Sequence, residues 1–270
     1  MKKIIFILIL NFLYLSRVLA QVQEILPSGV APAGADVVFT ERWLAFSNPA
    51  ILSREERVAV SVGYENRYFA AELSDEYLSV AVPTKYFNVG ASFNFFGYAN
   101  YHEIMAALTM ARRFGIVAMG VEFDYFNMFL PDEVGYRHAF TAQVGLQVDV
   151  TEQCVLGFRM FNPSFTQIDY NDVARRLPVM MHVGCNYTFI DDLDVLIEVG
   201  YVLNQGVDWA VGMEYRIMPE LLVRAGAHGA DYVIPSLGVG IAFAGFRFDL
   251  MAEADFRIGM SLLSNLSYRF

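Results

Sequence analysis

The stretch from His138 to Val150 alternates between apolar and polar residues almost without a fault. Phe140 and Val144 fall on one side of it, and Thr141 and Gln147 fall on the other. A period of two is the pattern of a β-strand, whose successive side chains point to opposite faces. In a soluble sandwich the apolar row would face a protein core. In a membrane barrel it would face lipid, and the polar row would line a lumen.

Segments of this kind follow one another from about residue 57 to the end of the chain, and no helical pattern of ten residues interrupts them. They are Val58–Tyr64, Tyr77–Val82, Phe87–Phe96, Met105–Ala111, Val117–Phe126, His138–Val150, Cys154–Phe161, Val179–Phe189, Leu193–Leu203, Val207–Ile217, Leu221–Ala227, Ile234–Phe243, Phe246–Phe256 and Ile258–Phe270. Many are close to the ~9–11 residues of a tilted membrane-spanning strand. The pattern predicts an all-β, up-and-down transmembrane β-barrel of about 14 antiparallel strands.

The connections between these segments fall into two alternating sets. The short set lies at residues 83–85, 113–115, 151–153, 191–192, 219–220 and 244–245, and the other set includes the long connections 65–75, 127–137 and 162–176. Short turns at one end and long loops at the other are typical of outer-membrane barrels, whose tight turns face the periplasm. An even number of strands then places both termini on the periplasmic side.

The polar rows of the predicted strands carry charged side chains at mid-strand, which are costly toward lipid but tolerable toward a lumen. The predicted lumen-facing residues are Glu122, Asp124, Glu198, Asp208, Glu214, Arg216, Arg247, Asp249, Glu253 and Asp255. The acids among them could form a cation-selective path. Alternatively, they could satisfy each other, the arginines and a plug in a filled interior, and we prefer this second interpretation because a plugged barrel needs such polar packing.

The amino-acid composition limits the classes of protein to which the chain can belong. The 270 residues are 56% hydrophobic and only 18% charged, and the formal net charge is -10. Soluble domains are usually less apolar and more highly charged. This composition excludes disorder, and the acidic balance argues against a nucleic-acid partner.

The first 20 residues have the pattern of a cleaved signal peptide. Lys2 and Lys3 precede an apolar run, Ile4–Leu15, and small residues at Val18–Ala20 come before Gln21. A short membrane anchor is the alternative, but the run is too short to span a bilayer well. No later stretch approaches the ~20 apolar residues of a transmembrane helix. The exported chain is therefore a soluble protein or a β-barrel.

The C-terminus favours the barrel. The last strand ends on an aromatic residue, with Leu266, Tyr268 and Phe270 on one face, which resembles the insertion signal of outer-membrane barrels. Together with the signal peptide and the sorted connections, this feature places the apolar row of residues 138–150 toward lipid. We therefore predict a location in the bacterial outer membrane, with membrane lipid and the barrel-assembly machinery as partners.

Residues 21–56 precede the first strand and do not alternate. This segment contains small residues at 31–35 and the candidate hatch residues Trp43, Phe46, Asn48 and Pro49. It could be a disordered leader, but its apolar content favours packing, and a barrel of fourteen strands has room for a plug. We therefore predict a hatch at 21–56 and the barrel at 57–270.

Several short motifs resemble the PorV/PorQ group within the FadL-type outer-membrane proteins. They are the sequence Ser47-Asn48-Pro49-Ala50, the strand 58–64, Tyr77–Lys85, Leu177-Pro178, Arg224–Gly226 and the closing residues 266–270. The resemblance implies a fourteen-strand barrel with an N-terminal hatch. FadL relatives pass hydrophobic molecules such as long-chain fatty acids, whereas PorV and PorQ relatives serve type IX secretion.

The chemistry-bearing residues do not predict an enzyme. The sequence has no phosphate-binding glycine loop, paired Cys-x-x-Cys or His-Glu-x-x-His motif, so we predict neither a cofactor nor a metal site. Cys154 and Cys185 could form a disulfide in an oxidising compartment or remain two thiols. A set of aromatic residues could belong to interfacial girdles, which we prefer, or stack against a ligand: Tyr64, Tyr98, Tyr101, Tyr125, Phe126, Tyr187 and Tyr201.

Three functional hypotheses follow. The first is a PorV/PorQ-like protein that serves export or attachment at the cell surface through secretion-system proteins. The second is FadL-like uptake of a hydrophobic ligand, which calls for a movable hatch and an apolar pocket near residues 43–46. The third is a barrel that binds nothing beyond the membrane.

Overall fold

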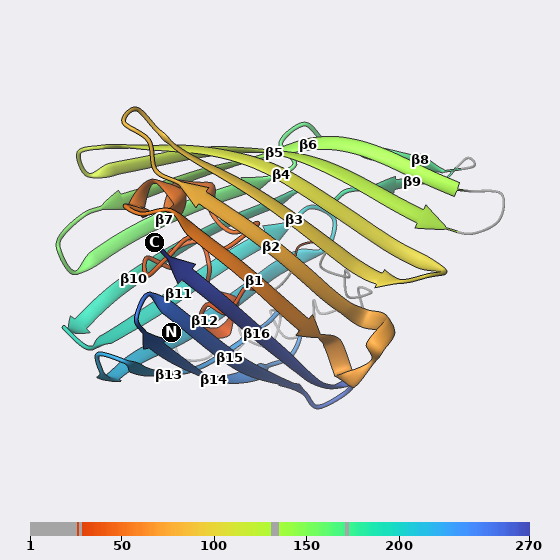
Figure 1. Cartoon of the computed structure of the whole chain (residues 1–270). Helices are drawn as coiled ribbons and strands as arrows, with labels where there is room; N and C mark the ends of the chain where they lie inside the picture. The colour runs from red at the N-terminus through yellow and green to blue at the C-terminus, as the bar shows by residue number, and fades with distance from the viewer. Residues whose placement is uncertain (1–25, 27–28, 131–134, 171–172) are drawn as a thin grey trace, which may run out of the picture.

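The wall of the molecule is a closed barrel of antiparallel strands, which confirms the predicted fold. The computed structural model describes residues 26, 29–130, 135–170 and 173–270. In this part of the chain fourteen strands pair in chain order, β7 pairs with β10, and β1 closes the ring against β16 (Figure 1). The wall strands are β1 (Ala59–Asn66), β2 (Ser74–Val82), β3 (Asn88–Tyr98), β4 (Tyr101–Phe114), β5 (Val117–Leu130), β6 (Gly135–Asp149), β7 (Cys154–Phe161), β10 (Met180–Ile190), β11 (Leu193–Val202), β12 (Gly206–Met218), β13 (Leu221–Gly229), β14 (Ile234–Phe243), β15 (Phe246–Asp255) and β16 (Gly259–Arg269).

Two of the predicted loops are wrong in extent. The predicted loop 127–137 is mostly strand, because β5 continues to Leu130 and β6 already begins at Gly135. The predicted loop 162–176 contains a two-stranded hairpin, β8 (Gln167–Tyr170) with β9 (Val173–Arg176). β5 and β6, with 14 and 15 residues, are longer than the ~9–11 residues that cross a membrane, and the β8–β9 hairpin is a separate two-stranded sheet. The apolar alternation that identified the wall strands is absent from both regions.

The two faces of the wall differ as predicted for a barrel in lipid. On β6, Phe140 is 72% exposed, whereas its neighbours Thr141 and Gln143 are buried. Apolar side chains such as Leu237 and Phe243 on β14 are likewise exposed on other strands, and the charged side chains Arg112 and Arg113 are exposed where β4 reaches its end. Because lipid and lumen alternate along a membrane strand, this exposed face is the lipid-facing one.

A cation on this outer face should destabilise the barrel according to its depth. We expect Leu237→Arg, near the middle of β14, to cost ~2–4 kcal/mol of unfolding free energy, because the guanidinium would lie in hydrocarbon. Phe243→Arg, at the end of the same strand, should cost about 0–1 kcal/mol. Urea unfolding in lipid vesicles measures both, and equal costs would contradict a lipid-facing position for Leu237.

The aromatic residues divide between the faces. Tyr64, Tyr187 and Tyr201 are exposed on the outer face, in keeping with a girdle. Phe126 is instead 2% exposed and packs with Tyr101 inside the barrel, so the assignment of these two residues to a girdle is wrong. The reason is parity, since Phe126 lies two residues after Asp124 on the same strand and therefore on the same face.

The two ends of the barrel differ in their connections. At one end, the short-turn end, the connections after β2, β4, β6, β10, β12 and β14 are tight, and β1 begins and β16 finishes there. The other end, the long-loop end, carries 67–73 with two 3-10 helices and the β8–β9 hairpin (Figure 1). The N-terminal segment lies inside the ring, toward the short-turn end. The predicted signal peptide at 1–20 lies outside the described residues.

Across the described ranges, none of the helices has the length and apolar character needed to cross a bilayer.

Candidate functional site: the lumen and the N-terminal segment

The N-terminal segment, defined here as residues 29–56, packs against the inner wall. Its first 3-10 helix, η1 (Pro32–Gly34), contacts β12, β13 and β14, and its second, η2 (Pro49–Arg54), contacts β3 to β6 on the far side. Its apolar side chains form one cluster with inward residues of the wall, among them Leu196 and Met251. Proline at the first position of each helix supplies a fixed φ and removes an N–H that would lack a partner there.

Inward-facing glycines let the backbone of this segment approach the wall. They are Gly90, Gly120, Gly145, Gly157, Gly184, Gly212 and Gly226. A Cβ added at Gly120 would lie 2.4 Å from the carbonyl carbon and oxygen of Pro49, and one at Gly212 would lie 2.5 Å from the carbonyl oxygen of Pro32. Real side chains do not make such contacts, so these positions admit the segment only as glycine.

Asn48 joins the segment to two wall strands. Its Oδ1 accepts from the backbone N–H of Ala50, 3.0 Å away, which caps η2. Its Nδ2 donates to the carbonyl of Val37 at 2.8 Å and lies 3.3 Å from the carbonyls of Leu146 and Phe158. Asparagine is favoured at such a cap, and here the same amide also ties two turns of the segment together and to the wall. Of the predicted hatch residues, Asn48 makes these bonds, and Pro49 lies against Gly120 and Gly145.

The other two predicted hatch residues are buried. Trp43 packs in the segment cluster, and its backbone N–H donates to Glu55 Oε1 at 2.8 Å. Phe46 is 1% exposed and has a positive φ of 59°, which turns the chain just before Asn48. It faces a different, apolar region of the lumen, described below.

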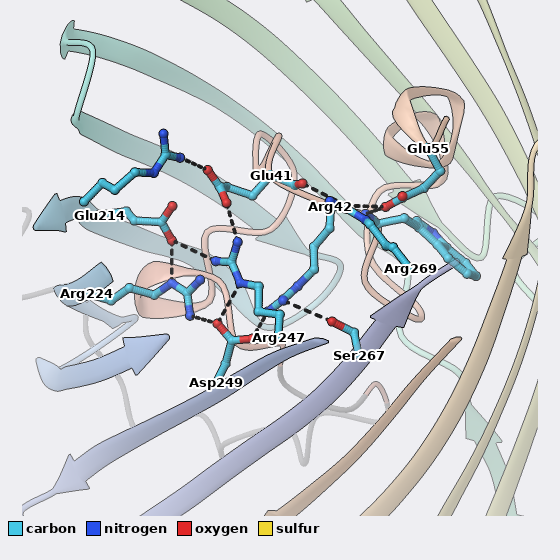
Figure 2. A network of polar contacts seen from close by, with 11 residues as sticks. Glu41, Arg42, Glu55, Glu214, Arg224, Arg247, Asp249, Ser267 and Arg269 are labelled. Carbon is cyan, nitrogen blue, oxygen red and sulfur yellow. Dashed lines mark hydrogen bonds and ion pairs between the residues drawn. The ribbon is translucent and has the colours of Figure 1, made fainter. Parts of the chain in front are cut away.

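Asp249 is the centre of a buried ion network between the segment and β12 to β16 (Figure 2). It is 0% exposed and accepts from Arg42 of the segment, from Arg224 at 2.6 Å and from Arg247 at 3.3 Å. Glu214 accepts from Arg224 at 2.6 Å and lies 3.8 Å from Arg247. The wall thus supplies paired charges, and Arg42 inserts into them.

Glu41 provides the second link of the network. Its carboxylate accepts from Arg247 and from Arg216, the latter at 2.6 Å (Figure 2). Burial alone would raise the pKa of Glu41, but the neighbouring arginines outweigh burial and lower it. Burial lowers the pKa of Arg42 to about 10, so Arg42 remains charged at neutral pH. The segment is therefore held by charge-assisted bonds of both signs.

Further polar contacts hold the segment around its circumference. Arg269 at the end of β16 donates to Glu55 at 3.0 Å, and Arg159 on β7 donates to Asp36 at 3.0 Å. Arg54 donates to Asp149 at 2.5 Å. A cavity of about 20 Å³, enough for a water or two, lies beside Arg42, where the segment meets β1, β2 and β16.

The remaining predicted lumen-facing residues lie on the inner wall with different partners. Glu198 accepts from the backbone N–H of Val37 at 3.1 Å, and its other oxygen lies 2.6 Å from His182 Nδ1. Asp208 lies 4.0 Å from His182 and is about one third exposed. Glu198 therefore bonds to the N-terminal segment, and Asp208 lies beside His182.

Two of the predicted lumen-facing acids lie at the long-loop end of the barrel. Asp255 accepts from the Tyr232 hydroxyl at 2.6 Å and from the backbone N–H of Arg257 at 2.8 Å, so it organises the turn between β15 and β16. Glu253 lies 3.7 Å from His228.

Glu122 and Asp124 form a separate buried pair on β5. Glu122 accepts from the Thr109 hydroxyl and, at 3.1 Å, from the amide of Gln143. Gln143 also donates to the carbonyl of Ser47 at 2.8 Å. This pair lies beside the turn at Phe46 and Ser47. At this turn the polar part of the lumen meets the apolar cluster that contains Phe46.

Toward the long-loop end one part of the inner wall is apolar, beside the buried acids Glu65, Asp75 and Glu103. The strand register places Met105, Phe126 and Ala139 one step beyond Ala107, Asp124 and Thr141 on three neighbouring strands. Two clusters cover this region. The first contains Leu26, Ala45, Phe46, Tyr77, Met105, Ala107, Phe161 and Met180, and the second contains Phe126, Met128, Ala139, Ile168 and Leu177. We call these residues the apolar route, because they extend from the β8–β9 hairpin to Phe46.

The residues of the predicted insertion signal lie on the outer face. Leu266 and Phe270 are exposed, and the Tyr268 ring lies 4.4 Å from Phe246 and 4.8 Å from Phe270, centroid to centroid. Phe270 also donates its N–H to Val58, which closes the last pair of strands. Their role as a signal stays a prediction.

Sequence reasoning missed several residues of this interior. Arg42, Glu41 and Glu55 were assigned only to a hatch as a whole, and the inward glycines were not recognised. A signal for the glycines does exist, because each lies on the polar row of its strand, where a residue without a side chain leaves a gap. Arg224 appeared only as part of a motif.

Comparison with known proteins supports the fold and goes no further. No protein-family model matches the chain, and no curated protein matches it. Among solved structures, the monoaromatic hydrocarbon channel CymD aligns with a TM-score of 0.63 and 13% identity, over 90% of this chain and 98% of that one. The Pseudomonas putida toluene transporter TodX gives 0.64 and 12%, over 88% and 96%. A Pseudomonas aeruginosa FadL homologue gives 0.62 and 11%, over 90% and 97%. The chain therefore has the fold of FadL-type barrels.

Proposed function

We propose that this barrel passes a hydrophobic small molecule across the outer membrane. The observation that carries the proposal is the apolar route, a set of inward methionine, phenylalanine and aliphatic side chains in a lumen that is otherwise polar. Small apolar molecules bind among side chains of this kind, and methionine adapts to ligands of different shape; in the closed state described here these side chains pack against one another. Two of the similar structures, a monoaromatic hydrocarbon channel and a toluene transporter, support the same class of cargo.

The N-terminal segment would act as the hatch of this path. The apolar route ends at Phe46, and the ion network and the glycine contacts begin beyond it. Cargo that has reached Phe46 can continue toward the short-turn end, which we assign to the periplasm, only if the segment shifts. The proposal therefore assigns binding to the apolar route and gating to residues 29–56.

Uptake by whole cells tests the proposal directly. The chain would be expressed in a Gram-negative host that lacks its own channel of this class, and entry of radiolabelled toluene and palmitate would be followed. Faster entry of either probe than in cells with an empty vector is the expected result. Unchanged entry of both, with the barrel present in the outer membrane, would overturn the proposal.

A substitution within the apolar route should separate binding from folding. We expect Phe126→Asn to reduce uptake on the order of tenfold, because a buried amide without partners opposes an apolar ligand. Phe126→Leu keeps the lining apolar and should retain most of the activity. Heat-modifiable gel mobility checks that both variants fold. Equal uptake by the two variants would show that the cargo does not pass Phe126.

Export of proteins is the second candidate, which the resemblance to the PorV/PorQ group implies. It rests on short motifs, and none of the structures named above belongs to that group. Purification from the native outer membrane under mild detergent tests it. Recovery of the barrel without any secretion component would count against this function, whereas co-purification would favour it over uptake.

A further inference from the structure

Two thiols meet on the outer face of the barrel. The Sγ atoms of Cys154 on β7 and Cys185 on β10 lie 3.8 Å apart. In the strand register Cys185 pairs with Leu156 and Cys154 pairs with Tyr187, so the two cysteines are diagonal neighbours on one face of adjacent strands. Diagonal side chains on antiparallel strands are within reach of one another. Both thiols are partly exposed.

We propose that Cys154 and Cys185 form an intramolecular disulfide in the exported protein. A disulfide needs sulfurs about 2.05 Å apart, so rotation about the two Cα–Cβ bonds must bring the atoms together by roughly 1.8 Å. Because diagonal Cα atoms on antiparallel strands lie about 7–8 Å apart and most disulfides join Cα atoms about 4.4–6.8 Å apart, closure also needs a small approach of β7 and β10. The inference is independent of the cargo and requires only passage through an oxidising periplasm.

The step is an ordinary thiol–disulfide exchange. The thiolate of one cysteine attacks the disulfide of a periplasmic dithiol oxidant and forms a mixed disulfide, and one sulfur of the oxidant leaves as a thiolate. The second cysteine then attacks its partner's sulfur, which releases the oxidant as a dithiol. Two thiol protons are lost, and two electrons pass to the oxidant. Cys154 is the first residue of β7, at the short-turn end that we assign to the periplasm, so a periplasmic oxidant can reach the pair once β7 and β10 lie side by side.

The bond would act at a particular seam of the wall. β7 and β10 are neighbours in the barrel, but the residues between them in the chain, 162–179, form the connection that carries the β8–β9 hairpin. β7 is also one of the shortest wall strands, with 8 residues. Linking residues 154 and 185 removes freedom from the unfolded chain over this whole connection. The disulfide would therefore fix the strands that support one side of the apolar route, where Phe161 and Met180 pair.

Differential alkylation tests the bond in the full chain. Outer membranes would be solubilised in denaturant with excess maleimide, with or without prior reduction, and the intact mass measured. We expect no maleimide on the unreduced wild type and addition at both cysteines after reduction. A peptide joining residues 154 and 185 should appear in the unreduced digest. Alkylation of both cysteines without reduction, or a disulfide-linked dimer, would overturn the proposal.

Serine variants give the matched controls. In Cys154→Ser the remaining thiol should be alkylated without reduction, and Cys185→Ser should behave likewise. Reduction should lower the temperature of heat modification of the wild type by roughly 5–10 °C, and it should leave both variants unchanged. A wild type whose transition does not move on reduction would contradict the proposed stabilisation of the β7–β10 seam.

Discussion

Replacing Gly120 by leucine is expected to expel the N-terminal segment from its seat while the wall still forms. A Cβ at this position would lie 2.4 Å from the carbonyl of Pro49, and the leucine would add three further carbons. The obstacle is backbone at the start of η2, which is packed against β4, β5 and β6, so no flexible side-chain end can give way. Overpacking of this kind costs ~1–3 kcal/mol, and here the docked state of the segment bears the cost.

Limited proteolysis measures this displacement. Cleavage within residues 29–56 should be about tenfold faster or more than in the wild type, because a protease samples the undocked population. Val121→Leu is the control, since it adds a methylene to the lipid-facing side of the same strand. It should leave cleavage unchanged. If Gly120→Leu is cleaved no faster than Val121→Leu, the segment does not dock against β5 in the way described.

The wall could be predicted from the sequence because its information is local. Each strand alternates apolar and polar residues with a period of two, because one of its faces meets lipid and the other meets the lumen. His138–Val150 is an example, with Phe140 outside and Gln143 and Gln147 inside. At the ends of β5 and β6 and in the β8–β9 hairpin this contrast is absent, so the sequence predicts loops there.

The interior could be predicted only in part. The inward direction of Asp249, Glu214 and Arg247 follows from parity, because each alternates with apolar neighbours. Their partners do not follow, since Arg42 and Asp249 are 207 residues apart and no pattern in a single sequence relates them. The sequence did not identify the role of the inward glycines for a similar reason. A glycine in the polar row of a strand can be interpreted only when the segment that packs against it is known.

Two kinds of contact therefore hold the segment, and they have different consequences. The glycine contacts depend on shape and fix where the backbone can lie. The ion network depends on charge, and it stabilises the docked state only while every buried group has its partner. A hatch held mainly by shape would open by sliding, whereas one held by buried ion pairs needs those pairs to separate or exchange partners. The charged contacts are the ones a gating mechanism must act on.

We expect Asp249→Asn to release the segment and to open the lumen to ions. The carboxylate of Asp249 is 0% exposed and accepts from Arg42, Arg224 and Arg247. Its loss leaves cationic side chains against a neutral amide, and breaking a buried pair in this way costs ~3–5 kcal/mol. Arg42 belongs to the segment and the other two arginines to the wall, so undocking is the direct way to relieve the repulsion. Conductance in planar bilayers should rise from near zero to that of an open channel.

Matched variants decide whether the effect comes from this network. Asp208→Asn removes a lumen acid that is about one third exposed and lies 4.0 Å from His182, so it should leave conductance unchanged and cost less than about 1 kcal/mol. The double variant Arg42→Gln/Asp249→Asn should lose less unfolding free energy than the two single variants lose together. The difference should be on the order of 1 kcal/mol or more, because both members of one pair are then gone. Conductance of Asp249→Asn equal to that of Asp208→Asn, or strict additivity in the double variant, would mean that Arg42 and Asp249 do not hold the segment.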